Sequence, residues 1–269
     1  MKDKVVIITG ASSGIGKALA LKFGEMGSKV VLAARNAENL EAVNLELVKS
    51  GTETLVVQAD VSVESDCEKV ISSSIDKFGK IDVLINNAGI SMRALFSELD
   101  LSVIRKLMDV NFWGTVYCTK YALPYLLQTK GSLVGVISVA GHIGLPARSG
   151  YSASKFAVRG FLDTLRSETQ KTGLHVLVVA PGFTESNIRK VALKADGNTQ
   201  AETPRDETKM MTSAAVAEKI YNGVIRRKRA MVLTFIEGKF TVFLNKWFPA
   251  LVDKLAYSHM AKEPDSPLK

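Results

Sequence analysis

Cysteine is scarce in this sequence, with only Cys67 and Cys118 among 269 residues. Both lie in helical apolar patterns, which argues against a disulfide framework and indicates a reducing compartment. Long hydrophobic runs are also missing: no stretch of about 18 apolar residues occurs, which argues against a transmembrane helix. Residues 5–8 begin an apolar strand pattern at once and leave no room for a signal peptide. We therefore expect a cytoplasmic protein.

Acidic residues are fewer than basic ones, since 27 Asp and Glu stand against 35 Lys and Arg, for a formal net charge of +8. This charge fits nucleic acid, a membrane surface or an anionic ligand, and it does not choose among them. The densest basic run, residues 226–229, closes a helical pattern and has no motif around it that reads DNA or RNA. We interpret it as a solvated helix C-terminus, where the helix dipole favours cations, and we expect no nucleic-acid partner.

Internal repeats and low-complexity linkers are absent too, and a hydrophobic content of 46% is ample for one core. Apolar runs rich in Val and Ile alternate with segments of helical period, a pattern typical of a doubly wound α/β fold. We predict one Rossmann-type domain, residues 1–260, with about seven parallel strands and helices on both faces, followed by a flexible tail, residues 261–269. Strands are predicted at residues 5–9, 30–34, 55–59, 83–86, 133–138, 176–180 and 231–235, and helices at residues 15–26, 36–49, 64–78, 101–127, 151–171 and 214–226.

Two segments depart from the regular alternation. Residues 183–212 form a long polar stretch after the sixth predicted strand, which is typical of a substrate lid. Residues 238–258 carry apolar side chains at helical spacing, interrupted at Pro249. We expect this apolar stripe to pack on the protein's own body or on a sister subunit, with a substrate lid or a peripheral membrane contact as alternatives. The stripe consists of Phe240, Phe243, Leu244, Trp247, Leu251 and Leu255.

A glycine-rich turn follows the first predicted strand and runs directly into a helix. Gly10 suits the tight turn, Gly14 lets backbone N–H groups approach a phosphate, and Gly16 allows the helix to pack closely on the strand. The helix N-terminus adds positive potential. We predict that the pyrophosphate of a dinucleotide binds this turn, which consists of Gly10, Ala11, Ser12, Ser13, Gly14, Ile15 and Gly16.

The end of the second predicted strand discriminates between the two nicotinamide dinucleotides. A carboxylate there binds the ribose 2′-hydroxyl and repels a 2′-phosphate. Arg35 follows this strand instead, and no acid stands where one is needed. Its guanidinium can pair with a 2′-phosphate through charge-assisted hydrogen bonds, so the predicted cofactor is NADP(H). The alternative is that Arg35 is an exposed residue that only ends the strand.

The same turn also fits G-x-S-x-G, the nucleophile elbow of serine hydrolases. An elbow needs an oxyanion loop from earlier strands, but only nine residues precede Gly10. It also needs a downstream acid and then a histidine. His142 adjoins a glycine, His175 lies in a strand pattern, and His259 lies near the end of the chain. The serine hydrolase hypothesis is therefore disfavoured.

Tyr151 and Lys155 are four residues apart at the start of a predicted helix, which places them on one face about one turn apart. A nearby ammonium favours the phenolate and brings the pKa of the tyrosine toward neutral, where it can exchange a proton. Ser138 ends the fifth strand at the sheet edge where doubly wound folds bind ligands, and its hydroxyl can hydrogen-bond a substrate oxygen. We predict that these three residues form a catalytic site.

Together these motifs resemble those of the short-chain dehydrogenase/reductase family, in its compact single-domain form. The resemblance covers nearly the whole chain. Beyond the residues already named, it rests on Asp60-Val61, Asn86-Asn87-Ala88-Gly89, Asn111 and Pro181-Gly182.

The resemblance implies roles for these further residues. Asp60 and Val61 are expected at the adenine, and Lys155 is expected to bind the nicotinamide ribose as well. Asn111 is expected to hold a water molecule in a proton relay. The ribose side of the cofactor is expected to be lined by Asn87, Ala88 and Gly89, and the carboxamide end to be contacted near Pro181, Gly182 and Thr184.

Residues 107–115 and 151–161 are similar to reductases of steroids, retinoids and other lipophilic carbonyls. We therefore expect an oxidoreductase for a small-molecule ketone, aldehyde or alcohol, with Tyr151 as general acid/base. A 3-oxoacyl thioester ketoreductase and a non-catalytic NADP-binding regulatory scaffold are the alternatives. The family resemblance also implies a homodimer or homotetramer, formed through the helices predicted at 101–127 and 151–171.

Overall fold

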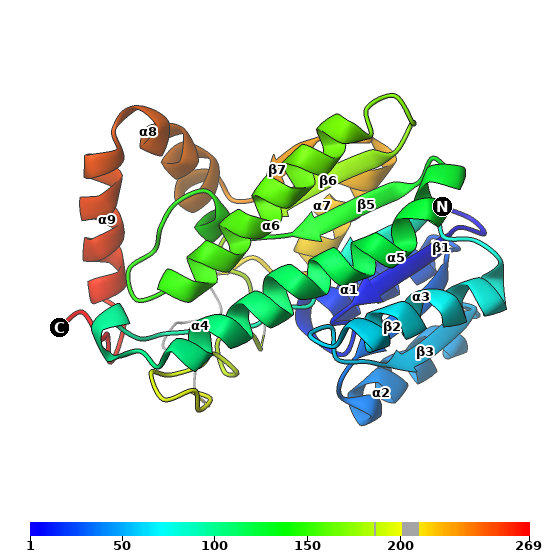
Figure 1. Ribbon diagram of the computed structural model, residues 1–269, viewed down its shortest axis with the longest axis horizontal. Coiled ribbons are helices and arrows are strands. Elements are labelled where there is room, and N and C mark those ends of the chain that lie inside the picture. Colours follow the sequence, from blue (N-terminus) through cyan, green and yellow to red (C-terminus); the bar gives the residue numbers. More distant parts are fainter. Residues whose placement is uncertain (186, 201–209) are drawn as a thin grey trace.

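The computed structural model describes residues 1–185, 187–200 and 210–269. Its centre is a seven-stranded sheet in the order β3-β2-β1-β4-β5-β6-β7, and every neighbouring pair is parallel (Figure 1). Because β1 pairs with both β2 and β4, the winding reverses at β1, and a crevice opens at the carboxyl ends of β1 and β4. The strands are β1 (Val5–Thr9), β2 (Lys29–Ala34), β3 (Thr54–Gln58), β4 (Val83–Asn86), β5 (Ser132–Val136), β6 (His175–Ala180) and β7 (Ala230–Val232).

Helices cover both faces of the sheet. Alternate residues of a strand point to opposite faces. Accordingly, Ile7 joins the apolar cluster beneath α3, α5 and α6, whereas Ile8 joins the cluster beneath α1, α2 and α7. The predicted doubly wound fold is thus confirmed. The helices are α1 (Gly14–Glu25), α2 (Ala37–Lys49), α3 (Glu64–Phe78), α4 (Leu101–Leu107), α5 (Gly114–Gln128), α6 (Ser149–Glu168), α7 (Ser213–Ile225), α8 (Thr241–Trp247) and α9 (Pro249–Ala261).

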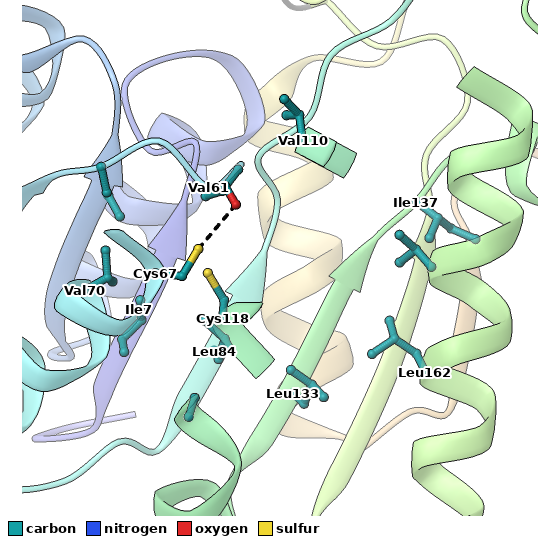
Figure 2. Close-up of a cluster of buried hydrophobic side chains, with 14 of the residues drawn as sticks. Ile7, Val61, Cys67, Val70, Leu84, Val110, Cys118, Leu133, Ile137 and Leu162 are labelled. Carbon is teal, nitrogen blue, oxygen red and sulfur yellow. Dashed lines mark hydrogen bonds between the residues drawn. The ribbon is translucent and has the colours of Figure 1, made fainter. Parts of the chain in front are cut away.

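Figure 2 shows the first of these clusters, in which strand residues meet the side chains of three helices. Both cysteines belong to it as free, buried thiols, and Cys67 Sγ donates a hydrogen bond to the Val61 carbonyl at 3.3 Å. The cluster fixes α3, α5 and α6 on the sheet, so the loops that leave β4 and β5 start from rigid positions. Labelled members are Leu84 and Leu133 on the strands, Cys67 on α3, Cys118 on α5 and Leu162 on α6.

One long helix predicted at residues 101–127 is divided in the structure. A π-helical segment, Met108–Trp113, separates α4 from α5. A π-helical turn accommodates extra residues in a helix and occurs frequently at functional sites. Asn111, a predicted catalytic residue, lies in this segment.

The last elements leave the sheet. Figure 1 shows α8 and α9 as a pair at the end of the molecule to which the arrowhead of β5 points. Val252 of α9 packs there against Val139 and Ile143, which follow β5. No helix among the described residues is long and apolar enough to cross a membrane.

The structure buries part of the segment that the sequence predicts to be a flexible tail, residues 261–269. Glu263 and Ser266 are buried, and the Ser266 hydroxyl donates a hydrogen bond to the Met260 carbonyl at 2.9 Å. Polar composition suggested fraying, but ion pairs with distant arginines hold Glu263 in place.

Candidate active site

A cavity of about 1140 Å³ lies at the carboxyl ends of the strands. It extends from the glycine turn after β1, past the ends of β4, β5 and β6, to α9. Two of the predicted residues, Ala11 and Asn111, do not line this cavity, and both are fully buried. The others line the cavity: Gly10, Ser12, Ser13, Gly14, Ile15, Gly16, Arg35, Asp60, Val61, Asn87, Ala88, Gly89, Ser138, Tyr151, Lys155, Pro181, Gly182 and Thr184.

The glycine turn has the geometry of a phosphate cradle. Gly10 and Gly14 adopt φ of 68° and 51°, a left-handed conformation that favours glycine. A Cβ on Gly16 would lie 2.0 Å from the Gly10 carbonyl oxygen, so only glycine lets α1 start this close to β1. Helix α1 has no side-chain cap and no acid in its first turn. Its N–H groups and dipole therefore face the cavity, and the residues present fit a dinucleotide pyrophosphate.

Asn87 and Ala88 fasten the loop after β4 to the end of β1. Both backbone N–H groups donate to Thr9 Oγ1 at 3.1 Å, and Asn87 Nδ2 donates to the Thr9 carbonyl at 2.9 Å. Thr9 ends the first predicted strand beside the glycine turn, and the sequence analysis assigned it no role of its own. Thr9 holds the two loops that flank the crevice in register.

Arg35 lies at the outer rim of the cavity, with its side chain 60% exposed. One guanidinium nitrogen, Nη1, is 3.8 Å from Asp60 Oδ2, an exposed and long ion pair of small energy. Asp60 is held instead by the Ser62 backbone N–H at 3.0 Å and the Ser62 hydroxyl at 2.7 Å. The Arg35 guanidinium is therefore available to an anion bound at this end.

Ser138 and Tyr151 meet across the cavity floor. Ser138 caps a short 3-10 turn, Val139–Gly141, by accepting a hydrogen bond from the Ala140 N–H at 3.2 Å. Burial raises the pKa of Tyr151, while a hydrogen bond with Ser138 and the positive charge of Arg148 act to lower it. The sequence prediction gave the lowering role to Lys155 and missed Arg148.

Lys155 is fully enclosed beside Tyr151, with Nζ 5.9 Å from the centre of the phenol ring. Its ammonium donates a hydrogen bond to the Val136 carbonyl at 3.0 Å. Burial lowers the pKa of Lys155 to about 8. The amine therefore loses its proton at a lower pH than a free lysine does, but it is still mostly charged at pH 7. Its charge is not among the causes that shift the pKa of Tyr151.

Asn111 joins three parts of the site through its amide. Its Oδ1 accepts from the Ile90 N–H at 2.8 Å, and its Nδ2 donates to the Ile90 carbonyl at 3.0 Å and to Ser154 Oγ at 2.8 Å. A Cβ on Gly89 would lie 3.0 Å from Asn111 Oδ1 and 3.3 Å from Lys155 Nζ. Glycine at position 89 thus allows these two polar groups to stand next to the cofactor loop.

The loop after β6 closes the other side of the cavity. Val139 N–H donates to the Pro181 carbonyl at 3.1 Å, and Thr184 Oγ1 donates to the Gly182 carbonyl at 3.2 Å. Leu193 pairs with the loop after β4, because Arg93 N–H donates to the Leu193 carbonyl at 2.8 Å. The described residues of the predicted lid thus pack over the cavity; residues 186 and 201–209 of that lid lie outside the described part.

The predicted amphipathic segment covers the cavity with one face and exposes the other. Leu244 packs on the cluster around Val139, and it lines the cavity together with Phe240. Phe243 and Trp247 are each 63% exposed. Packing on the protein's own body therefore does not account for the stripe, because α8 and α9 turn much of it outward, and part of it forms a cavity wall.

The three histidines have surroundings that do not fit a hydrolase triad. His142 pairs with Arg159 at 2.9 Å, and desolvation lowers the pKa of His142 to about 4. His175 pairs with Ser132 at 2.9 Å, and the His259 ring lies 6.0 Å from the Phe183 ring. Within the described ranges, no group of three acidic, histidine or cysteine side chains is placed to hold a metal ion.

The fold and the site first define a class. A Rossmann-type sheet with a glycine cradle, and with a phenol, a hydroxyl and an amine at the same edge, is the architecture of a nucleotide-dependent oxidoreductase. The family model for short chain dehydrogenase matches residues 4–196. The chain therefore belongs to the short-chain dehydrogenase/reductase family of oxidoreductases, which use nicotinamide cofactors.

Two curated relatives agree with this family. The mouse (Mus musculus) dehydrogenase/reductase SDR family member 7B is 34% identical over 99% of this chain and 84% of the relative. The 11-beta-hydroxysteroid dehydrogenase-like 4A of Arabidopsis thaliana is 36% identical over 96% of this chain and 84% of the relative.

A solved structure shares the fold. It is the alcohol dehydrogenase from the archaeon Thermococcus sibiricus, complexed with 5-hydroxy-NADP. The TM-score is 0.76 at 24% sequence identity, covering 88% of this chain and 98% of that one.

Proposed function

We propose that this protein is an NADP(H)-dependent reductase or dehydrogenase that interconverts a lipophilic ketone or aldehyde and its alcohol. The observation that carries the proposal is the meeting of Ser138, Tyr151 and Lys155 on the floor of a cavity that begins at a glycine cradle. In the cell the reductive direction is favoured, because the NADP(H) pool is generally kept reduced.

The chain's own groups handle the proton and the oxygen. NADPH supplies a hydride to the carbonyl carbon when it is bound. The Tyr151 hydroxyl donates its proton to the carbonyl oxygen as that oxygen gains negative charge, which completes the alcohol. Ser138 donates a hydrogen bond to the same oxygen. Lys155, with a pKa of about 8, holds the nicotinamide ribose and exchanges protons near neutral pH.

Apolar side chains around the reacting end support a lipophilic substrate. The described walls include Ile143, Leu145, Val252 and Leu255. The Arabidopsis relative is named for a hydroxysteroid, which agrees with this class. A 3-oxoacyl thioester remains the second candidate, because residues 107–115 and 151–161 also occur loosely among ketoreductases of that kind.

Loss of NADPH absorbance with a panel of lipophilic ketones, aldehydes and soluble 3-oxoacyl thioesters tests the function. We expect turnover of the lipophilic ketones and a fall of at least 100-fold in kcat/KM for Tyr151→Phe. Equal rates in that variant would remove Tyr151 from the mechanism. Tight NADPH binding without turnover of any substrate would instead support a non-catalytic scaffold.

We also propose a location and an assembly state for this protein. We place the protein in the cytoplasm, as a homodimer or homotetramer. Co-sedimentation with anionic vesicles tests the alternative of a peripheral membrane contact, since the exposed stripe of α8 and α9 is accompanied by Lys246 and Lys254.

A further inference from the structure

Three charged side chains that are far apart in the sequence meet at one end of the cavity. Arg93 follows β4, Arg148 immediately precedes α6, and Glu263 follows α9. Glu263 Oε2 lies 3.4 Å from Arg93 Nε and 3.6 Å from Arg148 Nη2. The side chains of Arg93, Arg148 and Glu263 are 8%, 13% and 4% exposed.

Charge pairing accounts for the burial of this carboxylate. An unpaired buried carboxylate or guanidinium is strongly disfavoured, whereas an acid held between two arginines is compensated. Arg93 Nη2 also donates a hydrogen bond to the Pro264 carbonyl at 2.5 Å, which ties the same guanidinium to the chain beyond α9. These contacts join the C-terminal segment to the loop after β4 and to the start of α6.

The cluster is next to the reacting end of the site. Arg148 and Glu263 line the cavity together with Tyr151, and Arg148 lies close enough to Tyr151 for its charge to favour the phenolate. The Glu263 carboxylate therefore occupies the position in which an acidic group on a substrate would meet Arg148.

We propose that Glu263 is a specificity-determining residue that fills an anion site formed by Arg93 and Arg148, and so reserves the cavity for uncharged substrates. The inference rests on the proposed function, since it assumes that the substrate carbonyl lies at Tyr151. Without the Glu263 charge, the same two arginines bind a carboxylate carried by the substrate.

A matched pair of ketones tests this specificity by binding rather than by turnover. Isothermal titration calorimetry measures the affinities of 4-acetylbenzoate and of its methyl ester for the protein saturated with NADP⁺. The wild type is expected to prefer the ester. In Glu263→Gln the ratio of acid affinity to ester affinity rises at least ten-fold, because the Arg148 guanidinium then binds the carboxylate of the acid in place of that of Glu263.

Three further variants distinguish loss of the ion pairs from general loosening of the tail. Asp253→Asn removes one exposed charge from α9 without touching the cavity and leaves the ratio at the wild-type value. Arg148→Met with Glu263→Gln cancels the gain in acid binding. Should Glu263→Gln fail to fold, Arg93→Met with Glu263→Gln restores the charge balance, retains Arg148 and shows the gain.

The outcomes are distinct from those of the proposed function. An unchanged ratio in folded Glu263→Gln, or no binding of the acid to any folded variant that retains Arg148, overturns the role of Glu263. Absence of ketone reduction by the wild type, with the binding ratios as expected, overturns the proposed reaction and leaves the anion site standing.

Discussion

At the scale of single residues, Lys155 is an amine buried in the site, where its charged form is less stable than in water. Burial lowers the pKa of this amine from 10.5 to about 8. Below pH 8 it is charged in both the folded and the unfolded chain, so folding bears the full cost of burying it. Between about pH 8 and 10.5 the folded form loses the proton and the unfolded form keeps it, so stability from this group rises with pH.

We predict that Lys155→Met raises the free energy of unfolding by roughly 1–3 kcal/mol at pH 7, because the buried charge is removed. The gain shrinks as the pH rises through 8 toward 10.5. Urea unfolding of the wild type and of Lys155→Met at pH 7 and pH 9.5 measures the difference in unfolding free energy. The exposed Lys254→Met serves as the control and should change stability little at either pH. A loss of stability at pH 7, or an equal gain at both pH values, contradicts the prediction.

We predict that Arg35, at the other end of the cavity, sets the cofactor preference. Replacing this guanidinium by alanine removes a charge-assisted contact worth about 1.5–3 kcal/mol. We expect Arg35→Ala to weaken NADPH binding roughly 10- to 100-fold and to leave NADH binding nearly unchanged. Fluorescence titration of both cofactors measures this, with the exposed Arg226→Ala as control. An unchanged NADPH-to-NADH ratio would show that another group reads the phosphate.

At the scale of elements, the π-helical segment between α4 and α5 is the feature that periodicity missed. Apolar spacing over residues 101–127 fits a regular helix, and a single wider turn barely disturbs that pattern. Yet the turn carries Asn111, whose amide joins the loop after β4 to Ser154 on α6. The segment therefore sets how the cofactor loop and the catalytic helix lie relative to one another.

Loss of the Asn111 amide should loosen this junction. Asn111→Ala leaves buried groups of Ile90 and Ser154 without their partner, and we expect a loss of about 2–4 kcal/mol in unfolding free energy together with lower kcat. Ser154→Ala removes one of the three hydrogen bonds and should cost about 1 kcal/mol. Chemical denaturation of both variants measures the difference; equal losses would contradict the central role of Asn111.

At the scale of the whole molecule, the described residues include two sets of exposed apolar side chains. One is the outer face of α8 and α9, and the other includes Trp113 and Phe156, which are 43% and 41% exposed. The second surface belongs to the helices through which the family resemblance predicts assembly. Large exposed aromatic side chains in such a position favour contact with another subunit.

We predict that the protein sediments as a dimer or tetramer of its 29.2 kDa chain. Trp113→Glu with Phe156→Glu should reduce the mass to that of one chain, because a charge on each side of a symmetric contact repels its copy. Analytical ultracentrifugation measures the mass of the wild type and of this double variant. Phe243→Ser with Trp247→Ser is the corresponding variant on the other surface. If only this second variant were monomeric, the interface would lie on α8 and α9 and the prediction would be wrong.

The sequence by itself determined what depends on near neighbours along the chain. Strand and helix periods gave the doubly wound sheet, and the spacing from Gly10 to Gly16 and from Tyr151 to Lys155 marked the two ends of the site. These signals are local, since the strand and helix repeats and the turn geometry act within a few residues.

Only the tertiary structure decided what depends on partners far away. The polar tail was expected to fray, but Glu263 is held by Arg93 and Arg148, which lie more than a hundred residues earlier. Likewise, the charge that acts to lower the pKa of Tyr151 is that of Arg148, whereas the sequence spacing pointed to Lys155. Pairing and desolvation are properties of the folded cavity, and no spacing in the sequence encodes them.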